Sequence, residues 1–135
     1  MAPIGEQRDV LEEQILAQFP TNGTPLYEVT GSAYQTMLDD YDASKINAVV
    51  LLTDGENDDL DPADDDQQFA ELIETLQTGS EGSSSRPVRV FTISYGEAAD
   101  VITLRAISQA TAAATYNASN PATINQVFTA VISNF

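Results

Sequence analysis

The chain contains no cysteine and no histidine. Without cysteine, disulfides and thiolate chemistry are excluded, and the chain suits either redox compartment. Without histidine, it lacks the usual general base, the Ser-His-Asp arrangement and the imidazole ligands of most zinc sites. The chain therefore lacks the side chains on which thiol and imidazole chemistry depend.

Basic residues are scarce as well: five Lys and Arg stand against 21 Asp and Glu, a formal net charge of −16. Such a surface repels nucleic-acid phosphates and anionic lipid surfaces, and it attracts cations. No apolar run approaches the ~20 residues of a membrane helix, and residues 1–10 lack the apolar core of a signal peptide. We therefore expect no nucleic-acid binding and no membrane insertion, and the compartment stays unknown.

The 135 residues are enough for a single domain with its own core. Apolar residues at helical spacing predict five helices, and runs rich in β-branched residues predict three strands. The helices are expected at about 7–19, 26–40, 64–79, 101–110 and 124–135, and the strands at 48–52, 88–94 and 114–116.

The apolar run from Ala48 to Leu52 is the most conspicuous of the three strands. Its lack of polar residues predicts a strand that is covered on both faces. Thr53, Asp54 and Gly55 follow at once, so a carboxylate stands where the strand leaves the sheet. Because ligands of open α/β sheets bind beyond the carboxyl ends of the strands, Asp54 is the first candidate for a functional residue.

Helix boundaries are indicated by capping residues. Thr24 precedes Pro25, the order of an N-cap and first helical residue, and Asp100 stands before the helix that starts at 101. Gly79 is placed to end the preceding helix. The Gly- and Ser-rich stretch 79–87 predicts a surface loop.

The alternation of strands and helices predicts an α/β fold, a doubly wound, Rossmann-like parallel sheet with helices on both faces. Three strands make a narrow sheet. Strand 48–52 is the most apolar of them, yet it comes first in the chain and would lie at an edge of the sheet. Its free flank would offer unpaired backbone groups to other chains. We therefore expect association through this flank, as a homodimer or with a complementing chain.

Three segments, in this order and spacing, resemble the later two thirds of a von Willebrand factor type A (vWA) domain. They are GTPLYE (23–28), VVLLTDGEN (49–57) and VRVFTISYG (88–96). The resemblance implies a vWA-like fold in which residues 1–135 form a single, partial domain that lacks the first strands. It further implies a protein-binding or adhesion-type module, and it leans toward an extracytoplasmic or cell-surface location.

In the vWA family, a metal-ion-dependent adhesion site holds Mg²⁺ or another divalent ion at the carboxyl edge of the sheet. An Asp-x-Ser-x-Ser loop, a threonine from a second loop and an aspartate after the fourth strand build it. By motif, Thr24 matches the threonine and Asp54 the aspartate. No Asp-x-Ser-x-Ser occurs here, and the nearest string, DASKI (42–46), precedes the strand. We therefore expect Mg²⁺, or Mn²⁺ or Ca²⁺, to bind weakly to the isolated chain.

The resemblance implies that a cation near Asp54 leaves one coordination position for a carboxylate of a protein ligand, without enzymatic activity. A first alternative is a metal-assisted phosphoester hydrolase that uses Asp54 with Glu56 or Asp58. A second alternative is a truncated fragment that has no ligand and only self-associates.

The acidic stretch after Asp54 also invites comparison with a calcium loop. Asn57, Asp59 and Asp61 occupy the first, third and fifth positions of that pattern. Pro62 stands where glycine is required, and Gln68 stands where a bidentate glutamate is required. The stretch is therefore interpreted as a solvated acidic loop.

Overall fold

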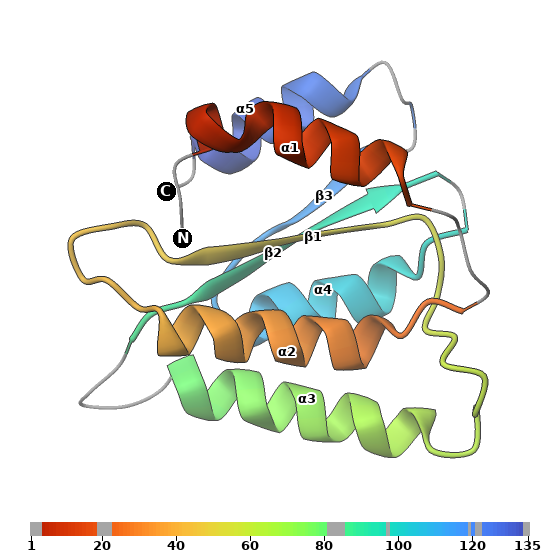
Figure 1. The fold of residues 1–135 in the computed structure, drawn as a ribbon. Helices are drawn as coiled ribbons and strands as arrows, with labels where there is room; N and C mark the ends of the chain where they lie inside the picture. The colour runs from red at the N-terminus through yellow and green to blue at the C-terminus, as the bar shows by residue number, and fades with distance from the viewer. Residues whose placement is uncertain are drawn as a thin grey trace.

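The computed structural model describes residues 4–18, 23–80, 86–96, 98–118, 120 and 123–133. These residues form a parallel sheet between two groups of helices (Figure 1). In chain order the elements are α1 (Ile4–Leu16), α2 (Leu26–Asp39), β1 (Ala48–Thr53), α3 (Asp65–Ser80), β2 (Arg89–Tyr95), α4 (Val101–Ala110), β3 (Thr115–Ala118) and α5 (Ile124–Ile132).

The described sheet has three strands in the order β1-β2-β3, and both pairs are parallel. Val50 aligns with Phe91 in the first pair, and Ile93 aligns with Tyr116 in the second. The predicted α/β fold with a parallel sheet between helices is confirmed at this level. All three strands end at one edge of the sheet, which brings the loops that follow them together.

The larger core lies on the side of the sheet covered by α2, α3 and α4 (Figure 1). Its buried members come from all three helices and from β2 and the residue before it, and they are Tyr34, Leu72, Leu76, Val88, Val90 and Ile107. The predicted apolar stripes of these helices therefore face this shared core. Burial of these side chains supplies the main favourable term in folding.

Gly79 was predicted to end α3, but the helix continues to Ser80. The side chain of Tyr34 passes directly over this residue. A Cβ atom at Gly79 would collide with the Tyr34 hydroxyl and would lie 2.9 Å from Cε1 of the ring. The glycine thus allows α2 and α3 to approach each other around the tyrosine. Residues 81–85 of the predicted surface loop lie outside the described residues.

The second core, on the opposite side of the sheet, is smaller. Phe91, Ile93 and Ala118 are buried there, and Val127 of α5 packs against them. Helix α5 contacts β3, and Ala48 is the one residue of β1 that packs against this second core in the described part of the chain. The prediction that β1 is covered on both faces is therefore wrong for this face: Val50 is 41% exposed and Leu52 is 48% exposed.

Helix α1 lies on the same side of the sheet as α5 (Figure 1). Every side chain from Gln7 to Gln18 is exposed, including the apolar side chains of Leu11 and Ile15. Phe19, the last residue of the predicted helix 7–19, lies outside the described residues. The amphipathic pattern predicted the helix correctly, but the apolar side chains of its described part are exposed. No helix in the described parts of the chain is long and apolar enough to cross a membrane.

Candidate functional site

Loops that follow β1 and β2 meet the segment before α2 at the carboxyl edge of the sheet. The backbone of Thr24 and that of Asp58 form a two-way bridge, in which each N–H donates to the carbonyl oxygen of the other residue. This short antiparallel pair holds the segment that precedes α2 against the loop that follows β1. The edge is thus built from segments that are far apart in the sequence.

The structure brings Thr24 to the loop that carries Asp54. The hydroxyl oxygen of Thr24 lies 4.0 Å from the position that a Cβ atom on Gly55 would occupy. On the other side, the Cβ of Asp54 lies 3.9 Å from the corresponding position on Gly96, which follows β2 and has φ of +82°. Both predicted metal ligands therefore stand on the same edge.

Thr24 does not cap helix α2, contrary to the sequence prediction. The N-cap position is taken by Pro25, which forms no side-chain cap bond, and the carbonyl of Thr24 accepts a hydrogen bond from Leu26 N at 2.6 Å. The Thr24 hydroxyl forms no hydrogen bond with any other described residue. This hydroxyl is therefore available to a ligand.

The capping role belongs to Asn57 instead. Its Oδ1 accepts a hydrogen bond from the backbone N–H of Tyr27 at 3.2 Å, in the first turn of α2. Its Nδ2 donates to Oδ1 of Asp65 at 2.6 Å, at the first turn of α3. One side chain thus joins the amino ends of two helices to the loop of Asp54. Asn is a favoured capping residue, but a cap supplied from 30 residues away leaves no local signal in the sequence.

The turn after β1 is held by Thr53. Its hydroxyl accepts a hydrogen bond from the N–H of Gly55 at 3.2 Å, across the exposed Asp54. Fixing the residues on both sides restricts where the carboxylate of Asp54 can point. Glu56 and Asp58, the partners expected of Asp54 in a hydrolase, are also exposed.

In the acidic loop, side-chain carboxylates accept hydrogen bonds from backbone N–H groups of the same loop. Oδ1 of Asp58 accepts from Leu60 N at 3.2 Å, and Oδ1 of Asp59 accepts from Asp61 N at 3.0 Å. The Asp61 N–H, followed by the Gln68 amide at 2.7 Å, lowers the pKa of Asp59. These turns stabilise a loop whose carboxylates are engaged locally, as in the solvated acidic loop that was predicted.

Thr24 and Asp54 supply one hydroxyl and one carboxylate, both hard oxygen donors of the kind that Mg²⁺ prefers. Within the described ranges, no three His, Cys, Asp or Glu side chains gather as a ligand group. The donor set therefore fits a divalent ion in chemical type but is incomplete. Most coordination positions would be left to water or to a partner.

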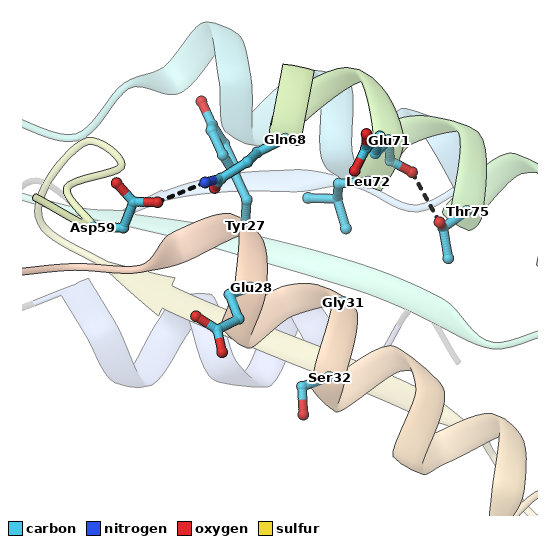
Figure 2. Close-up of a pocket in the computed structure, with 9 residues that line it drawn as sticks. All are labelled: Tyr27, Glu28, Gly31, Ser32, Asp59, Gln68, Glu71, Leu72 and Thr75. Carbon is cyan, nitrogen blue, oxygen red and sulfur yellow. Dashed lines mark hydrogen bonds between the residues drawn. The ribbon is translucent and has the colours of Figure 1, made fainter. Parts of the chain in front are cut away.

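A separate groove of about 570 Å³ lies between α2 and α3 (Figure 2). Neither Thr24 nor Asp54 lines it. The nine lining residues are Tyr27, Glu28, Gly31, Ser32, Asp59, Gln68, Glu71, Leu72 and Thr75. Figure 2 shows the hydrogen bond from the Gln68 amide to the Asp59 carboxylate at one end and the bond from the Thr75 hydroxyl to the Glu71 carbonyl at the other. No local pattern in the sequence indicated this groove, because α2 and α3 form it together.

Comparisons of the chain with models of protein families, with curated proteins and with solved structures found no match.

Proposed function

We propose that this chain is a vWA-like protein-binding module in which Thr24 and Asp54 hold a divalent cation at the carboxyl edge of the sheet. The observation that carries the proposal is the Thr24 hydroxyl, which has no partner among the described residues and lies beside Gly55. The vWA resemblance supplies the metal-ion-dependent adhesion site as the precedent for this pair.

The pair of donors suits a weakly held, water-rich ion. Mg²⁺ keeps several waters when it is bound through one or two protein oxygens. Two donors correspond to an affinity on the order of millimolar. The net charge of −16 raises the local cation concentration around the exposed Asp54. One of the remaining coordination positions is open to a carboxylate from a protein ligand.

Recognition of a carboxylate at this edge requires the cation. Residues 56–61 place four acidic side chains directly after Asp54, and they are Glu56, Asp58, Asp59 and Asp61. An acidic ligand is repelled by this loop, whereas a bound divalent ion reverses the sign of the local interaction. Binding of the partner therefore depends on the cation and stops when a chelator removes it.

The proposed role is binding without catalysis. The single lysine, Lys45, precedes the amino end of β1 and pairs with Asp42 at 2.8 Å, far along the strand from Asp54. It cannot activate a nucleophile at the opposite edge. Accordingly, we expect no hydrolysis of model phosphate esters in the presence of Mg²⁺.

Paramagnetic line broadening by Mn²⁺ tests the cation site residue by residue. We expect the amide signals of Gly55 and Gly96 to broaden first in the wild-type chain, and this broadening to be lost in Asp54→Asn. Thr24→Val, which removes only the hydroxyl donor, should weaken it. Asp39→Asn is the matched control, because it removes the same charge from the exposed carboxyl end of α2. Equal broadening in wild type and Asp54→Asn would overturn the proposal.

A further inference from the structure

We propose that two copies of this chain associate by pairing β1 with β1 in antiparallel orientation, which makes one continuous sheet of six strands. Each copy contributes its three described strands. The association requires no cation, so a test in the presence of a chelator separates it from the proposed cation binding at Asp54.

The backbone of β1 presents a free hydrogen-bonding flank. Arg89 N donates to Asn47 O at 3.3 Å, which fixes the alternation of the β1-β2 ladder. In a parallel pair, alternate residues point their N–H and C=O groups toward the neighbour. The groups of Asn47 and Val49 therefore face β2, and those of Val50 and Leu52 face away from it. In the described sheet, no strand pairs with this outer flank.

The same two residues carry the exposed apolar surface of the strand. Val50 is 41% exposed and Leu52 is 48% exposed, on the face that α5 leaves uncovered. Opposite residues of an antiparallel pair show their side chains on the same face, so even-numbered residues must meet even-numbered ones. A two-fold axis at Leu51 places Val50 opposite Leu52 of the second copy. This register pairs the outward backbone groups of Val50 and Leu52 and brings their side chains into contact across the two strands.

The charge distribution favours the antiparallel orientation over the parallel one. The acidic residues 54–61 all follow the carboxyl end of β1. The amino end of the sheet is closer to neutral, because Lys45 and Arg89 stand near Asp40 and Asp42. Antiparallel pairing sets each acidic loop beside the amino end of the other copy, whereas parallel pairing would set the two acidic loops side by side.

Arg89 is the positively charged side chain that lies near the acidic loop of the second copy in this arrangement. It is exposed, it aligns with Ala48 on the neighbouring strand, and it takes no part in the two ion pairs found among the described residues. In the register with its axis at Leu51, Ala48 lies opposite Asp54 of the second copy. Arg89 is thus one strand away from Asp54 of the second copy.

Sedimentation velocity over a range of concentrations, in buffer with EDTA, tests the association. We expect a monomer–dimer equilibrium for the wild-type chain and a monomer for Leu52→Lys, which puts a charge into the apolar row. Ile102→Lys is the matched control, since Ile102 is 83% exposed on α4, and it should leave the dimer unchanged. A wild-type chain that stays monomeric at the highest concentration, or a Leu52→Lys variant that still dimerises, would overturn the inference.

Two further variants test the orientation and the register. Arg89→Glu should weaken the association constant at least about tenfold, as expected of a charge facing an acidic loop, whereas Arg105→Glu on α4 should not. Because the chain lacks cysteine, Leu51→Cys introduces a single thiol at the two-fold axis. Opposite residues there lie close enough for a disulfide, so oxidation should yield a covalent dimer. Absence of this cross-link in a chain that dimerises would refute the pairing, and Ile102→Cys controls for random collision.

Discussion

Replacement of Asn57 by alanine should be among the most damaging single changes outside the core. The side chain accepts a hydrogen bond from Tyr27 N at the start of α2 and donates one to Asp65 at the start of α3. Alanine removes both bonds and leaves the two helix ends unconnected. The loop that carries Asp54 also loses its attachment to α2.

The size of the effect follows from the two bonds. Loss of an N-cap costs about 1 kcal/mol. A hydrogen bond to a charged group contributes about 1.5–3 kcal/mol when buried, and we take about 1 kcal/mol for this partly exposed pair. The sum is about 2 kcal/mol. With 135 residues, the unfolding entropy is about 0.28 kcal/mol/K, so the melting temperature should fall by about 7 °C.

Urea denaturation followed by far-UV circular dichroism measures this loss. Asn125→Ala is the control, because Asn125 lies exposed in α5 and its side chain makes no hydrogen bond with another described residue. It should change stability by no more than about 0.5 kcal/mol. A double-mutant cycle of Asn57→Ala with Asp65→Ala isolates the second bond, with an expected coupling of about 1 kcal/mol. A loss below about 0.5 kcal/mol in Asn57→Ala would refute the bridging role.

Two more predictions concern the core and the acid range. Leu76→Ala removes a fully buried side chain and should cost about 2–5 kcal/mol, whereas Leu16→Ala, 87% exposed on α1, should cost less than about 0.5 kcal/mol in the same urea titration; equal losses would contradict the packing described for α1. The Thr103 hydroxyl, at 2.6 Å, lowers the pKa of Asp100 below its ordinary value of 3.8. The ionised Asp100 therefore stabilises the folded chain at pH values above its ordinary pKa of 3.8. This stabilisation is lost as the pH falls below about 4 and through the lowered pKa. Thr103→Val should flatten the pH dependence of the unfolding free energy in that range, and an unchanged slope would exclude the bond as its cause.

Local patterns in the sequence predicted most of the elements. The helices of residues 26–40 and 101–110 and the strand at 88–94 lie within two residues of their observed bounds, because apolar periodicity reports the buried face directly. Asp100 caps α4 as predicted, since a cap at the adjacent residue is a local interaction. The edge position of Asp54 followed in the same way from the end of the apolar run.

Interactions between distant segments could not be predicted in this way. Thr24 carries the local signature of an N-cap, yet Asn57 takes the role after the bridge between Thr24 and Asp58 sets the two segments together. Gly79 has the signature of a helix end, yet it lies inside α3 to make room for Tyr34. In both cases a contact made in the folded chain overrode the local preference.

The sequence by itself determined that this is an acidic α/β chain without thiol or imidazole chemistry, because composition and periodicity act residue by residue. Tertiary structure decided which side chains meet: it left the Thr24 hydroxyl beside Gly55 without a partner among the described residues, and it left one face of β1 exposed at the edge of the sheet. Such pairings depend on how layers and loops pack across long stretches of chain. These long-range pairings cannot be predicted from local sequence patterns.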